Sequence, residues 1–278
     1  MNRKISSATK ALRFHIPASI LAILWLIPIA LVFATSFREA GDLARNGVGS
    51  IPTSFTLANY LEAWRSAGLF QALANSFAVT VPAVALSIGL ASLAAYALSR
   101  YEIRYGRQIL LVMLAGNLLP VQLTLVPVSR LSQWLGIYDQ LTAIVLVQVA
   151  FGLGFYTFVL YGFMRSIPFE VQEAAVIDGA GPLRVFWYVI LPLARPSLAA
   201  LSALSFTWIF NDLLWSLALL QTQSKLPVTA AVLSLNGQFV TSWSVVAAGT
   251  VVAALPPVIV FAMFQRYFVS GLTLGAVK

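Results

Sequence analysis

The stretch EAAVIDGAGPLRVFWYVILP occupies residues 173–192, between two long apolar runs. It lies in a connection, residues 165–196, that is long for a link between neighbouring elements. Pro168 can begin a helix in this connection, and Gly179 can end it after roughly three turns. A second short helix can begin at Pro182 and stop at the Leu-Pro pair that closes the stretch. The pattern predicts a helix–turn–helix, which physical reasoning alone allows either to rest on lipid or to bind a partner.

On either side of this connection, the chain has six apolar runs of about 20 residues in all, the length that a helix needs to cross hydrocarbon. These runs cover 14–37, 70–98, 108–129, 140–164, 197–220 and 245–268. The 278 residues are 60% hydrophobic and 9% charged, with a mean hydropathy of +0.88. Because lipid offers no partners for backbone groups, runs of this length predict spanning helices rather than a β-barrel. We expect one all-α integral membrane domain over residues 1–278.

The orientation of these helices follows from the cationic residues, since cytoplasmic loops carry an excess of Lys and Arg. Twelve of the 17 cations lie before the first run, after the last run, or in the second and fourth connections: Arg3, Lys4, Lys10, Arg13, Arg100, Arg104, Arg107, Arg165, Arg184, Arg195, Arg266 and Lys278. The other five lie in or beside the alternate connections: Arg38, Arg45, Arg65, Arg130 and Lys225. The split predicts that both termini and the connection 165–196 are cytoplasmic.

Several kinds of chemistry are excluded by the residues that the chain lacks. The net charge of +8 is scattered between apolar runs, so no basic block for nucleic acid is expected. There is no cysteine and His15 is the single histidine, so we expect no metal site and no disulfide. No GxxxxGK[ST] phosphate loop and no GxSxG nucleophile motif occur. The chain is therefore not expected to bind ATP, to hold a cofactor or to be an enzyme by itself.

The fifth apolar run contains polar and aromatic residues that suggest a solute path. Ser205, Trp208, Asp212 and Trp215 follow at spacings of three, four and three, so on one continuous helix they would share a face. Asn211 borders that face. Aromatic rings with hydrogen-bonding groups suit a sugar, and an acid in a span is expected to face protein or water. Two interpretations of Asp212 remain: it lines a cavity, or it makes an interhelical hydrogen bond that only holds the assembly together.

The third run is interrupted by Asn117, Pro120 and Pro127, and a proline inside a helix frees a carbonyl. We expect a kink there. Gly116, Pro120 and Thr124 stand four residues apart beside Asn117, and they could supply a second wall of the path.

The stretch 173–192 resembles the EAA motif of ABC importer permeases, in which Glu-Ala-Ala is followed at fixed spacing by a glycine and a final Leu-Pro. The matching residues are Glu173, Ala174, Ala175, Gly179, Leu191 and Pro192. Val189 stands where the family usually has Ile, while Asp178, Ala180 and Phe186 also fit. The resemblance implies a type I permease fold in which this loop is a coupling helix that docks on a cytoplasmic ATPase. The expected docking residues are Glu173, Ala174, Ala175, Asp178, Gly179, Phe186, Leu191 and Pro192.

The resemblance narrows to the second, six-span permease of maltose-type carbohydrate importers. It rests on FTLANY at 55–60, AAYALSR at 94–100, the pair Asn211-Asp212, and GLTLGAVK at 271–278. Phe210 departs from the pattern, since the family usually has Trp before that Asn.

This narrower resemblance implies a cell-membrane subunit whose partners are a second, homologous permease, two ATPase subunits that bind ATP and Mg, an external solute-binding protein and lipid. The expected solute path comprises Asn117, Trp208, Asn211, Asp212 and Trp215. The identity of the solute is not decided by the resemblance. A sugar is favoured, and a polyol, a glycoside or a glycerophosphodiester is an alternative. A secondary transporter is the rival class, but such carriers do not need a docking loop.

Overall fold

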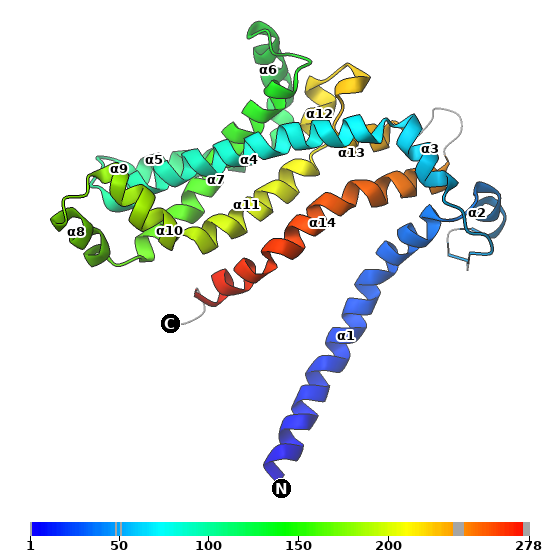
Figure 1. Cartoon of the computed structure of the whole chain (residues 1–278), viewed down its shortest axis with the longest axis horizontal. Coiled ribbons are helices and arrows are strands. Elements are labelled where there is room, and N and C mark those ends of the chain that lie inside the picture. The colour runs from blue at the N-terminus through cyan, green and yellow to red at the C-terminus, as the bar shows by residue number, and fades with distance from the viewer. Residues whose placement is uncertain (1, 48, 51, 236–241, 275–278) are drawn as a thin grey trace. The chain divides into compact units, whose positions relative to one another are not determined.

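The computed structural model describes residues 2–47, 49–50, 52–235 and 242–274, and every regular element in that part of the chain is a helix (Figure 1). The prediction of an all-helical chain is therefore confirmed. The last four residues of the tail 271–278, including Lys278, lie outside the described residues. The chain divides into two compact units, Met1–Leu69 with Val232–Ala253, and Phe70–Ala231 with Ala254–Lys278.

The first unit begins with a long apolar helix and two short ones. These are α1 (Asn2–Ser36), α2 (Ala40–Asn46) and α3 (Ala58–Ser66). The part of α1 from Arg13 to Ser36 is long and apolar enough to cross a membrane, which agrees with the predicted span 14–37. Two Pro residues lie within α1 without ending it.

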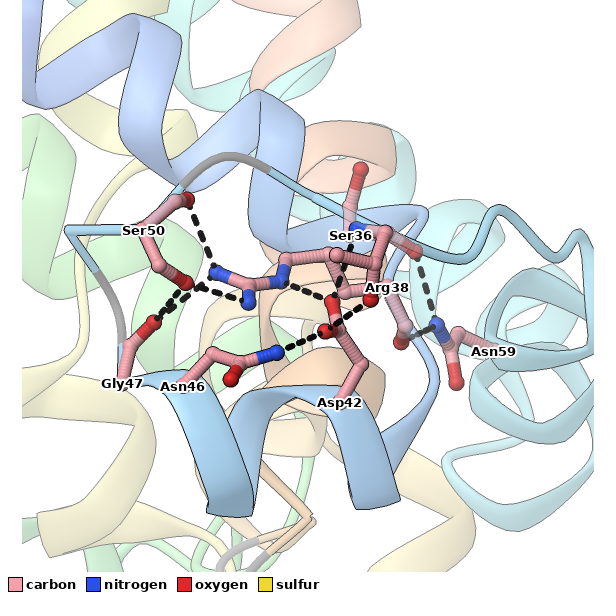
Figure 2. A network of polar contacts seen from close by, with 8 residues as sticks. Ser36, Arg38, Asp42, Asn46, Gly47, Ser50 and Asn59 are labelled. Carbon is pink, nitrogen blue, oxygen red and sulfur yellow. Dashed lines mark hydrogen bonds and ion pairs between the residues drawn. The ribbon is translucent and has the colours of Figure 1, made fainter.

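A buried polar network orders the chain between α1 and α3 (Figure 2). Arg38 is only 1% exposed, and its Nε donates to Asp42 Oδ2 at 2.8 Å. The other guanidinium nitrogens donate to the Gly47 carbonyl and to both oxygens of Ser50. Asp42 also accepts bonds from Thr53, and Arg38 above all holds the pKa of the Asp42 carboxyl well below its usual range. Because both charges are paired and hydrogen-bonded, the network can be buried and fixes α2 beside the end of α1.

Among the described residues, the α-helices from α4 to α12 lie in the second unit, apart from Leu69 at the start of α4. They are α4 (Leu69–Arg100), α5 (Gly106–Ala115), α6 (Val121–Trp134), α7 (Leu141–Ser166), α8 (Phe169–Ile177), α9 (Pro182–Val185), α10 (Leu191–Leu193), α11 (Arg195–Phe210) and α12 (Leu214–Leu219). Short 3-10 segments occupy Gly116–Leu118 and Gln223–Lys225, and a π-helical segment occupies Phe186–Ile190. Two further helices follow, α13 (Val228–Leu233) and α14 (Trp243–Leu274).

The core of the second unit forms where α4 packs against α7. Ala91 and Ala95 are fully buried, and small side chains allow another helix to approach closely. They share one apolar cluster with Leu160 and Met164 of α7. In Figure 1, α8 and α9 lie at one end of this pair, while α6 and α12 lie toward the other.

Among the described residues, four helices are long and apolar enough to span a membrane. They are Arg13–Ser36, Leu69–Arg100, Leu141–Ser166 and Trp243–Tyr267, and they correspond to the predicted runs 14–37, 70–98, 140–164 and 245–268. The other two predicted runs are broken helices. The count of six spans therefore stays a prediction.

The third run, 108–129, contains the expected break, because α5 ends at Ala115 and α6 begins at Val121. Pro120 precedes the first residue of α6, where its missing N–H is harmless. Gly154 of α7 allows α7 to lie close to the end of α5, because a Cβ at this position would lie 2.1 Å from the Met113 carbonyl oxygen of α5. The last turn of α5, just before the break, therefore lies directly against Gly154.

Two predictions about helix ends were wrong. The fifth run, 197–220, is not one continuous helix, since α11 ends at Phe210 and α12 begins at Leu214. Pro192 does not end the helical path after Pro182, which continues to Leu193 because proline fits the first turn of a new helix. This path then meets α11 at an angle of 76°.

Candidate functional site

The break after α11 is built around Asp212. Its Oδ2 accepts a bond from the backbone N–H of Trp215 at 3.1 Å, the way an acidic side chain caps the start of a helix. Its backbone carbonyl accepts a bond from the Thr229 hydroxyl at 2.9 Å. These backbone groups of a broken apolar span are therefore bonded within the chain, as a lipid environment requires.

The other end of α12 is held by Asp139, in the loop before α7. The Asp139 N–H donates to the Leu219 carbonyl, which ends α12, at 2.9 Å. Its carboxylate accepts bonds from the Thr222 hydroxyl, from the backbone N–H groups of Gln221 and Thr222, and from Lys225 Nζ. These bonds, the Thr222 hydroxyl first, hold the pKa of Asp139 well below its usual range. The six residues of α12 are thus fixed at both ends by aspartates.

A cavity of about 480 Å³ opens beside α12, within the size range of small-molecule sites. Its polar lining side chains are Asn117, Gln122, Gln148 and Asp212. Its aromatic walls are Phe151, Phe155, Tyr156, Trp208 and Trp215. Trp215 is 4% exposed and packs on Phe151 with ring centroids 5.5 Å apart, whereas Trp208 is 72% exposed. The cavity therefore offers flat apolar rings together with amide and carboxylate groups.

Most of the residues predicted for the solute path lie around this single cavity: Asn117, Trp208, Asp212 and Trp215. Asn211 does not line it, and its Nδ2 donates to the Thr207 carbonyl at 2.8 Å. That any of these residues contacts a solute stays a prediction.

The predicted helical face is only partly present in the structure. The residue spacing placed Ser205 and Asp212 on one face of a continuous helix, but the helix ends between them and Ser205 is fully buried. Gly116, Pro120 and Thr124 are not among the lining residues either. Gln148 also lines the cavity and was not predicted, although a polar glutamine inside an apolar run is itself a signal of function.

The predicted coupling element begins with α8. At its end, the Gly179 N–H donates to the Val176 carbonyl, and the Ala180 N–H donates to the Ala175 carbonyl. This pair of bonds is the Schellman motif, which needs a left-handed residue, and Gly179 has a φ of 82°. No atom lies within 4 Å of a Cβ built at Gly179, so its requirement is the backbone conformation alone.

The residues predicted to dock on an ATPase fall into two groups. Glu173, Ala174, Asp178 and Gly179 are exposed on α8 and its turn. Phe186 is only 1% exposed and packs inside, so it can support a docking surface only from beneath. Ala175, Leu191 and Pro192 are partly buried. A groove of about 420 Å³ separates the two halves of the element, with Asp178 and Arg184 among its lining residues.

Residues 87–274, more than half of the chain, match the family described as binding-protein-dependent transport system inner membrane component. The osmoprotective compounds uptake permease protein GgtD of Synechocystis sp. is 34% identical over 285 residues, which cover 100% of this chain and 95% of the relative. The diacetylchitobiose uptake system permease protein NgcG of Streptomyces coelicolor is 34% identical over 279 residues, covering 98% and 92%.

A solved structure shows the same fold. It is the crystal structure of a bacterial ABC transporter involved in the import of the acidic polysaccharide alginate, and one of its chains superposes with a TM-score of 0.78. The sequence identity is 24%, and the match covers 95% of this chain and 98% of that chain. The fold, the family match and the full-length relatives agree: the chain belongs to the family of binding-protein-dependent transport system inner membrane components.

Proposed function

We propose that the chain is a permease subunit of an ATP-driven carbohydrate importer in the inner membrane, where it forms half of the translocation path. The observation that carries the proposal is the cavity beside α12, which joins two tryptophans to amide and carboxyl side chains in a chain of this family. The diacetylchitobiose relative, which matches along nearly the whole chain, supports a saccharide as the solute.

The solute path runs past Trp208 and Trp215, whose rings suit the apolar faces of a sugar. Asn117 and Asp212 are placed to bond the hydroxyl edges. In this proposal Asp212 acts twice, as the cap that shapes α12 and as a polar group of the path. Asn211 belongs to the path only if its bond to Thr207 opens, so it is the weakest candidate.

Coupling to ATP occurs through residues 165–196. Glu173 is exposed and makes no ion pair within the described part of the chain, so it is available to a cation on the ATPase. Ala174 lets a partner surface approach closely, and Gly179 sets the turn after α8. ATP and Mg are held by the separate ATPase chains, and this subunit holds no cofactor.

The assembly consists of this subunit, a second homologous permease, two ATPase subunits and an external binding protein. Residues 1–278 form one permease domain with six spans and both termini in the cytoplasm. The third span is made by α5 and α6 together, and the fifth by α11 and α12. The twelve-to-five division of cations supports this orientation.

A second solute class is favoured by a specific relative. The osmoprotective compounds permease matches the whole chain at 34% identity, as high as the diacetylchitobiose relative. Polyols, glycosides and glycerophosphodiesters carry hydroxyl groups that the amide and carboxyl side chains of the cavity can bond, so they stand as the alternative.

Two measurements separate these candidates. The cognate binding protein is screened by thermal shift against di- and trisaccharides, polyols, glycosides and glycerophosphodiesters. The best ligand is then offered in radiolabelled form to cells with and without this chain. A saccharide that stabilises the binding protein and enters only when the chain is present supports the carbohydrate proposal. Uptake restricted to a polyol or another osmoprotective solute would show that the chain belongs to an importer of the second solute class.

A further inference from the structure

The last turns of α4 hold two residues with long-range contacts, Tyr96 and Arg100. They stand four apart and therefore point to the same side of the helix. The helix itself is distant in sequence from the coupling element at 165–196, yet both side chains reach it. Neither contact has a part in the solute path or in the docking surface described above.

Arg100 binds the start of the coupling element. It is 5% exposed, and its Nη2 donates to the carbonyls of Met164 and Ile167, the latter at 2.9 Å. These carbonyls lie at the end of α7, where the regular helical bonds run out and where a cation suits the helix dipole. The Met164 carbonyl also accepts the Ile167 N–H at 3.3 Å. The guanidinium also lies over the ring of Phe169, the first residue of α8, with Cζ 4.8 Å from the ring centroid.

Tyr96 binds the second half of the element. Its hydroxyl donates to the carbonyl of Pro182, the first residue of α9, at 3.0 Å. Its ring lies against Phe186, with centroids 5.2 Å apart, inside the apolar core. The two ends of the segment that includes α8 and its turn are therefore attached to the same face of α4.

A contribution to the stability of the fold alone does not explain why an arginine occupies position 100. Its Nε and Nη1 are buried without an acceptor within the described residues. A buried cation with more than half of its N–H donors unpaired is costly, and an apolar side chain of similar length would fill the same space. The planar guanidinium, which lysine lacks, is what lets the side chain stack on a ring while one of its nitrogens bonds two carbonyls.

We propose that Tyr96 and Arg100 are positioning residues that make α4 move with the coupling element. A displacement imposed on α8 and α9 by the ATPase would then reach α4 directly, in addition to the covalent path through α7 and α11. This inference rests on the proposed function, because it assigns a route for the motion that the coupling element receives. It adds a mechanical contact outside the loop itself.

The test uses the complete importer reconstituted in proteoliposomes with its ATPase, partner permease and binding protein. Three variants are compared with wild type: Arg100→Met, Arg100→Lys and Tyr96→Phe. Arg107→Met is the control, since Arg107 is a nearby arginine at the start of α5 and has no contact with the coupling element among the interactions described. We measure the ATPase that co-purifies, the ATP hydrolysed and the solute moved per ATP.

We expect Arg100→Met to assemble but to move roughly fivefold less solute per ATP, the lower end of typical coupling between sites. Arg100→Lys keeps the charge but not the planar guanidinium, and it should fall in between. Tyr96→Phe removes one oxygen and leaves the ring. It therefore still tests the link between α4 and the coupling element if Arg100→Met does not reach the membrane. Wild-type solute per ATP in Tyr96→Phe and in every Arg100 variant that assembles overturns the inference. Failure of the proposed function is a different result, in which the wild-type chain retains no ATPase.

A second readout follows the motion itself. Because the chain has no cysteine, spin labels at Leu93→Cys on α4 and Ile177→Cys on α8, both exposed, report one distance. In Arg100→Met the distance distribution should broaden, while Arg107→Met should keep the wild-type distribution. An unchanged distribution in Arg100→Met contradicts the attachment of α8 to α4.

Discussion

Asp212 Oδ2 accepts a hydrogen bond from the backbone N–H of Trp215 at 3.1 Å, so one carboxyl group both caps α12 and lines the cavity beside it. The cap orients the helix that carries Trp215, and Trp215 is the buried wall of the same cavity. Structure and solute path therefore depend on one side chain, and suitable substitutions separate the two roles.

Asp212→Asn keeps a good capping group, whereas Asp212→Ala removes it at a cost of about 1 kcal/mol. We expect the Asn variant to unfold at the wild-type temperature but to take up less solute. The Ala variant should unfold at a lower temperature and also take up less solute. Thermal unfolding of the purified assembly and uptake by cells provide the two measurements. If the Asn variant transports like wild type while the Ala variant falls apart, the residue is structural only.

Gly154 is the point where α7 meets the break between α5 and α6. Because a Cβ would lie 2.1 Å from the Met113 carbonyl oxygen, Gly154→Ala should destabilise the chain by about 1–3 kcal/mol through overpacking. Gly162→Ala is the matched control on the same helix, where nothing lies within 4 Å of a Cβ. Thermal unfolding of both variants in detergent checks this. Equal unfolding temperatures for the two would show that the chain can shift there freely.

Asp139 gives a pH dependence with a defined sign. Its pKa is depressed in the folded chain, so its stabilising bonds are fully present above the ordinary carboxyl pKa of about 4 and are lost only as pH falls through the lower folded value. Amide exchange protection at Gln221 and Thr222, relative to the unfolded chain, should stay constant from about pH 8 to pH 5 and decline only below about pH 4. Asp139→Asn should lower this protection at every pH and remove the acid-side decline. Glu62→Gln, at an exposed carboxyl of α3, is the control, and a loss of protection near neutral pH would contradict the assignment.

The orientation can be tested by labelling single cysteines in the cysteine-free chain. Ala44 and Ile177 are both exposed, in α2 and α8 respectively, and the proposed topology puts them on opposite sides of the membrane. Ala44→Cys should react with an impermeant thiol reagent added to spheroplasts, whereas Ile177→Cys should react only after lysis. The opposite pattern would invert the orientation.

The sequence predicted those features that depend on local chemistry. The runs 70–98 and 140–164 became α4 and α7 because long apolar segments have few alternatives, and Gly179 closes α8 because only a residue that tolerates positive φ fits the turn. The break near Pro120 was also expected, since proline and asparagine mark it in the sequence.

The features that were missed depend on distant residues. No proline or glycine marks the helix break at Asp212 in the sequence. The break is stabilised by the bond from Thr229 and by the cap on α12. Gly154 could not be distinguished from other glycines in apolar runs, because its requirement comes from Met113 on another helix. The buried position of Phe186 was likewise invisible, since the side chain that covers it, Tyr96, lies far away in the sequence.

Co-purification of the ATPase with the tagged chain measures whether α8 and its turn bind this subunit to an ATPase. The wild-type chain and Glu62→Gln should retain the ATPase subunit. Glu173→Ala should lose much of it, because removing one partner of a buried interfacial ion pair costs about 2–5 kcal/mol. Gly179→Leu should lose it too, since a left-handed backbone costs a leucine about 1–2 kcal/mol. A wild-type chain that purifies from its own membrane without an ATPase, or variants that retain it in full, would contradict the account.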